Sequence, residues 1–180
     1  DEDVGIYSFA AMLVEGIYHI LVMIRINFNP VLVSATKNKN LHAAQELLQK
    51  TKLYIYPVTI VLSLLAISAF LILTIFMIPE KELFTGLYSL VILLIGLTII
   101  SAYVPFDNLL MASGFPGLQT LQHLSLVVCN ILMNIILVPF FGIIGAAFAT
   151  ASSYLIGIFV LVIMTRRKLK WDLFLNKIIS

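Results

Sequence analysis

The side chains best suited to chemistry lie on one side of the first apolar segment, residues 4–33. Glu15 and His19 are four residues apart, so on a helix one stands above the other, with Ser8 within roughly 40° of both. Further polar residues on this side are Tyr7, Tyr18, Arg25 and Asn29. A carboxylate and an imidazole at this spacing can share a proton, which favours a proton- or cation-coupling site, or a carboxylate that binds sugar. The structural alternative is a buried hydrogen bond to a neighbouring helix.

Arg25 lies toward the end of the same segment and offers a different chemistry. A guanidinium can hold a phosphate group through two parallel hydrogen bonds, which indicates a phosphate-bearing ligand. The alternative is that its side chain extends to the lipid headgroups while its stem stays in apolar surroundings.

A second set of polar side chains lies on one face of residues 118–138, within roughly 60° on a helical wheel. These residues are Gln119, His123, Asn130 and Asn134. Carboxamide and imidazole groups both donate and accept hydrogen bonds, so together they suit a cavity for hydroxyl-rich ligands. The alternative is hydrogen bonding between helices.

Small residues open the next apolar segment, residues 143–165. Two helices can approach closely in lipid where bulky side chains are absent, so we predict helix packing at Gly142, Gly145, Ala149 and Ser153. Gly142 together with Pro139 also marks a turn between the two segments.

The composition decides which kind of protein positions these residues. Hydrophobic residues make up 61% of the 180 residues and charged residues 11%, with a formal net charge of +2. Soluble domains have roughly 45–50% hydrophobic residues and about 25% charged residues. These values exclude soluble enzymes, disordered chains and a basic nucleic-acid surface. Cys129 is the single cysteine, which excludes an internal disulfide, and no Cys/His cluster has the spacing of a metal site. We predict no catalytic residue and no metal.

Spanning the hydrocarbon core takes about 20 apolar residues. Five segments are long enough, about 4–33, 54–78, 83–111, 118–138 and 143–165. The sequence therefore predicts an all-α, polytopic membrane helix bundle with five transmembrane helices. The third helix is expected to bend or end near Pro105. Asp107, just beyond it, is expected to be solvated, and the alternative is a position in a cytoplasmic vestibule.

The remaining segments are predicted to lie at the membrane surface. Residues 34–53 hold four lysines and fit a cytoplasmic amphipathic connector, either a separate interfacial helix or an extension of the second helix. Residues 166–180 are expected to form a basic cytoplasmic tail that anchors at the interface, with Trp171 at headgroup level.

Basic residues are distributed unequally between the two sides. With five helices, one side receives nine lysines and arginines and the other only Lys81 of the Pro79–Glu82 connector. The nine are Lys37, Lys39, Lys50, Lys52, Arg166, Arg167, Lys168, Lys170 and Lys177. The positive-inside rule then predicts a protein of the cytoplasmic membrane with an outward N-terminus and a cytoplasmic C-terminus. The opening Asp1-Glu2-Asp3, without Met, indicates a C-terminal piece of a longer chain, cut just before a membrane helix.

The junction between the last two segments resembles that of the polysaccharide flippases of the multidrug, oligosaccharidyl-lipid and polysaccharide exporter superfamily. Their pattern is an Asn, a Pro, Gly-x-x-Gly-Ala-Ala-x-Ala-Thr and Ser-Tyr, matched here by Asn134, Pro139, residues 142–150, Ser153 and Tyr154. The opening Val4-Gly5-Ile6-Tyr7-Ser8, Pro30 and the lysine-containing connector are also similar, so the resemblance covers essentially the whole chain.

The resemblance implies twelve to fourteen helices in two lobes around a central cavity, with this chain as most of the second lobe. The implied function is alternating-access transfer of an undecaprenyl-diphosphate-linked oligosaccharide to the outer leaflet for surface polysaccharides such as O-antigen. Charged groups are expected to line the cavity, with Glu15 and Arg25 as candidates. The implied partners are the lipid-linked oligosaccharide, membrane lipids, the first lobe and polysaccharide assembly proteins, with H⁺ or Na⁺ as coupling ion and no cofactor.

Two other function classes are weighed against this one. A cation-coupled multidrug exporter of the same superfamily also needs a carboxylate such as Glu15, but Arg25 and the second polar set favour the flippase. A membrane enzyme, such as a polysaccharide polymerase, would be expected to use a substantial outward loop, and the outward connectors here are short.

Overall fold

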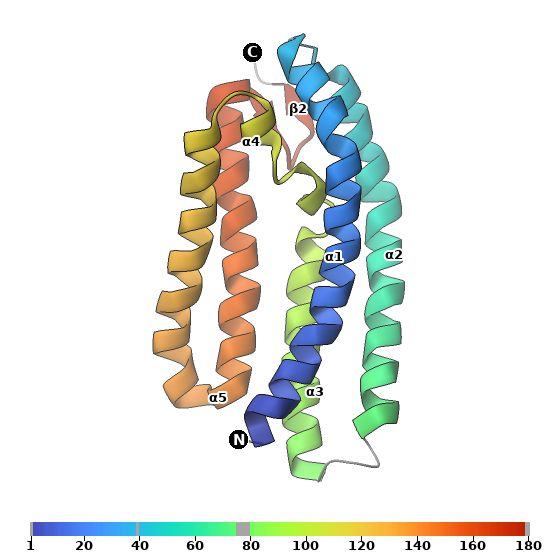
Figure 1. Cartoon of the computed structure of the whole chain (residues 1–180), viewed down its shortest axis with the longest axis vertical. Coiled ribbons are helices and arrows are strands. Elements are labelled where there is room, and N and C mark those ends of the chain that lie inside the picture. The colour runs from blue at the N-terminus through green and yellow to red at the C-terminus, as the bar shows by residue number, and fades with distance from the viewer. Residues whose placement is uncertain (1, 39, 75–79, 179–180) are drawn as a thin grey trace.

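The computed structural model describes residues 2–38, 40–74 and 80–178 as a bundle of long helices (Figure 1). The helices are α1 (Glu2–Lys37), α2 (His42–Thr74), α3 (Glu80–Ile100) and α5 (Pro116–Leu169), with the short η1 (Val104–Phe106) and α4 (Leu109–Ala112) between α3 and α5. Two short antiparallel strands follow, β1 (Trp171–Asp172) and β2 (Lys177–Ile178), with Trp171 opposite Ile178.

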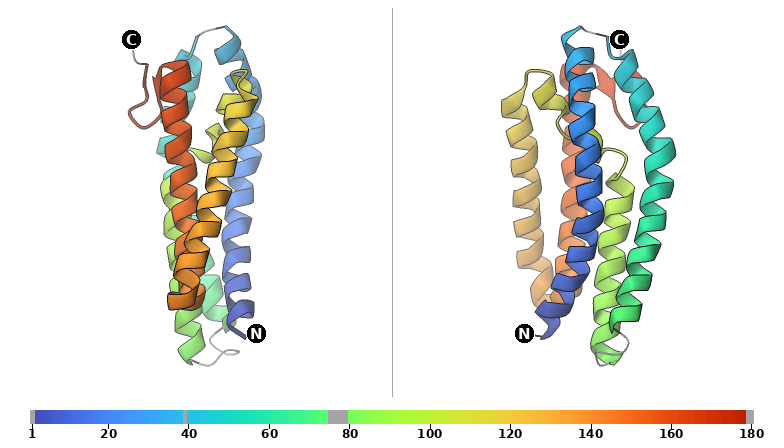
Figure 2. Two further views of the ribbon diagram at one scale, coloured as in Figure 1. Left: turned by 90° about the vertical axis from the view of Figure 1, so that its left-hand side faces the viewer. Right: turned by 45° about the vertical axis from the view of Figure 1, so that its right-hand side comes forward.

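Helix α3 lies at the centre of the bundle and contacts α1, α2 and α5. Helix α5 turns back on itself at Gly142, where the backbone leaves the helical region, so its two arms, 116–141 and 143–169, run side by side (Figures 1 and 2). The C-terminal strands lie at the end of the bundle where α2 begins. We call this the basic end, because it carries Lys37, Lys50, Lys52, Arg166, Arg167, Lys168, Lys170 and Lys177.

Three described helices are long and apolar enough to cross a membrane, Gly5–Lys37, His42–Thr74 and Pro116–Leu169. A fourth span results if Phe84–Ile100 and Val104–Ala112, which are bent by 55° to each other, are counted together. Of the five expected helices, 118–138 and 143–165 correspond to the two arms of α5, which are separated at Gly142, where the backbone is not helical.

The described helix ends also differ from the expected ones. Helix α1 continues through Pro30 to Lys37, and α2 already begins at His42, so most of the 34–53 connector is helical. Of its two predicted forms, the extension of the second helix is the one observed. The predicted end of that helix at residue 78, and Pro79, lie outside the described residues.

The expected interruption of the third helix occurs five residues before Pro105. A proline ring in a helix clashes with the carbonyl of the residue four positions earlier, here Ser101, and it supplies no N–H group. Helix α3 therefore ends at Ile100, and Pro105 lies in the first turn of η1. The Ser101 hydroxyl donates to the Thr98 carbonyl at 2.8 Å, which satisfies one carbonyl of the last turn.

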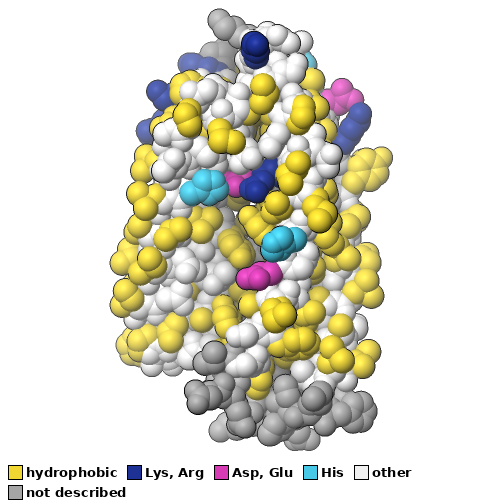
Figure 3. Space-filling model, viewed as in Figure 1, with side chains coloured by type: hydrophobic (Ala, Val, Ile, Leu, Met, Phe, Trp, Pro, Cys, Tyr) yellow, Lys and Arg dark blue, Asp and Glu magenta, His cyan; other side chains and the backbone are white. Residues whose placement is uncertain are grey.

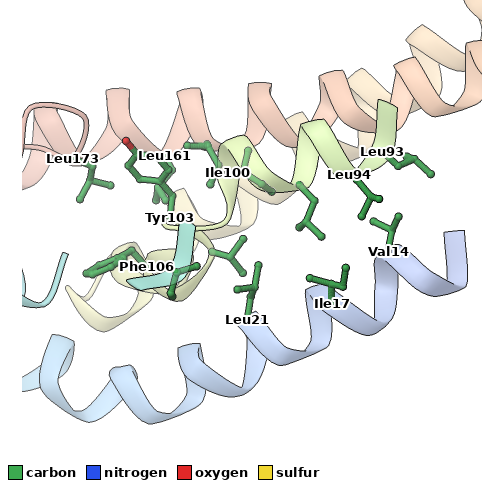
Figure 4. Packing of buried hydrophobic residues seen from close by; sticks show 14 of the residues in the cluster. Val14, Ile17, Leu21, Leu93, Leu94, Ile100, Tyr103, Phe106, Leu161 and Leu173 are labelled. Carbon is green, nitrogen blue, oxygen red and sulfur yellow. The ribbon is translucent and has the colours of Figure 1, made fainter. Parts of the chain in front are cut away.

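The core joins α1, α3 and the second arm of α5 through apolar side chains (Figure 4). Phe106, fully buried, packs edge to face against Phe28 of α1 at 5.9 Å between ring centres, and against Trp171 at 6.2 Å. The η1 turn is thus held between α1 and the C-terminal segment.

The C-terminal segment 170–178 forms a hook against α2. Trp171, predicted at headgroup level, is fully buried within the protein and donates to Asn176 Oδ1 at 3.2 Å. Gln45 and Asn176 exchange side-chain-to-backbone hydrogen bonds of 3.1 and 2.9 Å, and Lys52 donates to two carbonyls of the hook.

Two glycines make the α5 hairpin possible. Gly142 has φ 56° and ψ −133°, a backbone conformation that side chains disfavour, and no neighbour lies within 4 Å of the place a Cβ would take. It therefore makes the turn and does not pack helices, so the packing role expected for Gly142 is wrong. At Gly145 a Cβ would lie 2.5 Å from the Leu137 carbonyl oxygen, so the arms need glycine there.

We expect Gly142→Ala and Gly145→Ala each to destabilise the protein, by roughly 1–3 kcal/mol for the strained φ of Gly142. Gly16→Ala is the control, because its Cβ would meet nothing within 4 Å and alanine favours a helix. Melting temperatures in detergent measure the effect. Equal melting temperatures for Gly142→Ala and Gly16→Ala would contradict this account of the turn.

Asp172 gives the hook a predictable response to pH. Burial would raise the pKa of Asp172, but the Leu175 and Phe174 amides and the Arg166 guanidinium outweigh burial and lower this pKa below its ordinary value of 3.8. Because the pKa is lower in the folded state, the ionised Asp172 stabilises the fold at pH values above 3.8. This contribution is lost as the pH falls through the folded-state pKa.

Asp172→Asn should lower the melting temperature by the same amount from pH 5 to 7, and the difference from wild type should shrink only below pH 3.8. A difference that already shrinks near pH 6 would contradict the lowered pKa of Asp172.

Candidate functional site

Asp107, in the turn between η1 and α4, collects polar side chains from two other helices. Arg25 of α1 donates to Asp107 Oδ2 through Nη1 at 3.0 Å. Gln122 of α5 donates to Asp107 Oδ1 at 3.0 Å and also faces the Gly157 carbonyl at 3.4 Å. The Asp107 side chain is 11% exposed, so the expectation that it is solvated is wrong. The break in α3 turns this carboxylate toward α1 and α5.

His123 and Gln119 extend the network along the first arm of α5. His123 Nε2 lies 2.8 Å from the Gln119 amide nitrogen and 3.7 Å from Asp107 Oδ2. An amide nitrogen donates and a carboxylate accepts, so His123 Nε2 lies between a donor and an acceptor.

Several buried polar atoms of this region have no hydrogen-bond partner within the described residues. They are Arg25 Nε, the Asn29 amide oxygen one turn further along α1, and the Gln119 amide oxygen. A buried donor or acceptor left unpaired costs about 1–3 kcal/mol. The polar network is therefore incomplete at these three atoms within the described residues.

A cavity of about 220 Å³ lies beside the network, between α1, the η1 turn and the two arms of α5. Tyr18 and Tyr154 stack across it with parallel rings 6.3 Å apart, and its lining also includes Asp107, Gln122 and His123. Figure 3 shows acidic, basic and histidine side chains gathered in the middle of this face, where the surface is hollowed. A mixed charged and aromatic lining suits a ligand with both polar groups and rings.

Glu15 and His19, expected to share a proton, are both exposed on α1. His19 Nδ1 lies 2.7 Å from the backbone carbonyl of Glu15, not from its carboxylate. Their side chains are outside the lining of the cavity beside Asp107. Tyr18, which lies next to His19 in the sequence, does line this cavity.

Asn130 and Asn134 are not brought to this cavity. Asn130 donates to Thr150 and Ser153 of the second arm at 3.4 Å each, and Asn134 donates to Asn130. Ser153 and Ala149 are fully buried between the arms. These amides join the two arms of the hairpin, which is the structural alternative for the second polar set.

Sequence reasoning missed three residues of this site, Asp107, Gln122 and Tyr154. Gln122 could have been found, because it lies three residues after Gln119 and so on a neighbouring part of the helix face. The sequence marks Tyr154 only as part of the Ser-Tyr pair in the junction pattern, which does not indicate a cavity residue. Nothing local marks Asp107 as buried, since its partners come from residues 82 positions before it and 15 after it.

Comparison with known proteins gives one relative, a Methanocaldococcus jannaschii protein described as an uncharacterized membrane protein. It is 28% identical over 162 residues, which cover 87% of this chain and 37% of the relative. The chain thus spans little more than a third of the length of that relative. No family model and no solved structure matches the chain. The apolar spans and this relative together indicate the class of protein. The chain is a multi-pass membrane protein.

We expect the ion pair of Arg25 and Asp107 to show a coupling energy of about 1–3 kcal/mol in a double-mutant cycle. The cycle compares Arg25→Ala, Asp107→Ala and the double variant by their free energies of unfolding. Removing either partner leaves the other charge largely buried, so each single change should cost nearly as much as both. Glu46 and Lys50, an exposed pair at 2.7 Å, provide the control, whose coupling should stay within error. Equal couplings for the two pairs would refute the role of burial.

Proposed function

We propose that this chain forms one wall of the substrate path in a flippase that moves a lipid-linked oligosaccharide across the cytoplasmic membrane by alternating access. The resemblance at residues 134–154 first suggested this class. The observation that carries the proposal is the position of Arg25: its guanidinium is held by Asp107 on one side, while its Nε is buried and has no partner among the described residues.

Arg25 suits the diphosphate of such a substrate because its side chain is partly exposed and its partner Asp107 can be replaced by a phosphate. A side chain 21% exposed, beside a hollowed polar surface, can exchange a carboxylate for a phosphate of similar geometry. When a phosphate takes Arg25, Asp107 keeps Gln122 and still has His123 Nε2 at 3.7 Å. The network thus offers two arrangements, as the two states of an alternating-access cycle require.

The sugar portion would be bound by groups that donate or accept hydrogen bonds. The unpartnered oxygens of Asn29 and Gln119 can accept from sugar hydroxyls, and the stacked Tyr18 and Tyr154 offer flat apolar surface. The polyprenyl tail would remain in lipid, outside the bundle.

The proposal includes a membrane arrangement. Helix α5 would cross twice because its two arms fold back at Gly142, which gives five crossings together with α1, α2 and the bent α3–α4 segment. The basic end would face the cytoplasm, in agreement with the positive-inside rule. The rest of the cavity wall would come from a longer chain, and polysaccharide assembly proteins would receive the product.

A multidrug exporter driven by H⁺ or Na⁺ is the second candidate. The observation that favours it is the combination of Tyr18, Tyr154 and Asp107 in one cavity, since aromatic rings and a carboxylate bind organic cations. In that case Arg25 would compete with the drug for Asp107, and removing Arg25 would not weaken binding.

The test uses cells that lack the full-length gene and receive wild type, Arg25→Ala, Arg25→Lys or Glu15→Gln. The leaflet on which lipid-linked oligosaccharide accumulates is then measured with a non-permeant reagent. We expect cytoplasmic accumulation without the gene, restored outward delivery with wild type and at least tenfold slower delivery with Arg25→Ala, because a charged hydrogen bond to phosphate is worth about 1.5–3 kcal/mol.

Asn27→Ala provides the matched control, because Asn27 is exposed on α1 and bonds only the Met23 carbonyl among the described residues. It should restore delivery fully at equal protein level. Normal outward delivery in cells without the gene would refute the flippase, and lost resistance to cationic drugs in those cells would favour the exporter.

A further inference from the structure

A second concave surface lies on α5, away from the polar network. It is an apolar groove of about 290 Å³ between the two arms, and it ends at two basic side chains. The first arm contributes Leu118 and Leu121, the second arm Val160, Ile163 and Met164, and the basic end Arg167 and Lys168. None of these lining residues is acidic.

This groove and the polar cavity share no lining residue. At 100° per residue, Leu121 lies roughly 100° around the first arm from the cavity residue Gln122, whereas Leu118 lies within roughly 40° of it, at the border between the two surfaces. On the second arm, Val160 and Ile163 lie roughly 60° and 120° from the cavity residue Gly157. A molecule in the groove would therefore leave the Asp107 network untouched.

The basic residues near the end of the groove differ in whether they form an ion pair. Arg166, outside the groove, is paired with Asp172 of the hook. Lys168 Nζ lies 5.9 Å from the centre of the Phe115 ring, and no ion pair involves Arg167 or Lys168 within the described residues. Both are exposed. Two positive charges thus stand unneutralised where the apolar lining stops.

We propose that the groove binds one anionic phospholipid, with an acyl chain against its apolar lining and the phosphate group on Arg167 and Lys168. The guanidinium can hold phosphate oxygens through two hydrogen bonds, and the ammonium adds a point charge. Apolar lining and unpaired basic groups meet in one groove at the basic end of the bundle, as the chains and headgroup of a phospholipid meet at a membrane surface. The bound lipid holds the open sides of the two arms together.

The test is native mass spectrometry of the full-length protein after incubation with phosphatidylglycerol or phosphatidylcholine. We expect wild type to retain phosphatidylglycerol in preference to phosphatidylcholine. The double variant Arg167→Ala with Lys168→Ala should bind phosphatidylglycerol more weakly by a factor of at least about ten. Ile163→Trp, which fills the groove and keeps both charges, should also lose the lipid.

Two control variants separate this site from general effects. Lys37→Ala with Lys50→Ala removes the same charge from the same end of the bundle and should keep the lipid. Phe159→Trp enlarges an exposed side chain outside the groove and should keep it too.

The following results would overturn the proposal: equal retention of both lipids by wild type, an equal loss in the Lys37 and Lys50 variant, or binding that survives both groove variants. None of these measurements involves transport, so the result is independent of the proposed function.

Discussion

A carboxylate inside an apolar bundle can persist only where donors surround it, and Asp107 meets that condition by drawing on three parts of the chain. Arg25 comes from α1, Gln122 from α5, and Asp107 itself from the turn after the broken α3. Charged groups in lipid are costly unless they pair or face water. The break before Pro105 and the polar site are therefore one feature, because a continuous third helix would carry Asp107 away from both partners.

The network is incomplete in a way that separates it from a purely structural ion pair. A buried pair stabilises a fold only when its remaining donors and acceptors are also satisfied. Here Arg25 Nε and the Gln119 oxygen are buried without a partner among the described residues, and His123 has two competing partners. These unsatisfied groups belong to residues next to Asp107, Gln122 and His123, which line the polar cavity.

Local pattern was sufficient for the helices and the hairpin turn, and insufficient for the site. Long apolar runs predict membrane helices because lipid requires internal hydrogen bonding, and Gly142 marks a turn through its own backbone freedom. Asp107 was expected to be solvated and Trp171 to lie at headgroup level, since polar loops and basic tails usually lie outside the hydrocarbon region. Their burial depends on partners far along the chain, Arg25 for the first and Phe106 for the second, which periodicity cannot reveal.

The order in which these contacts act follows from their rigidity. Phe106, next to Asp107 in the chain, is fully buried between Phe28 and Trp171, so packing rather than charge fixes the backbone that carries the carboxylate. Arg25 has a long side chain that is partly exposed, and its conformations are limited mainly by the pairing with Asp107. If the pairing is exchanged, the arginine moves and the carboxylate stays. The C-terminal hook, through Trp171, thus keeps the acceptor in place, while the position of the donor depends on the pairing itself.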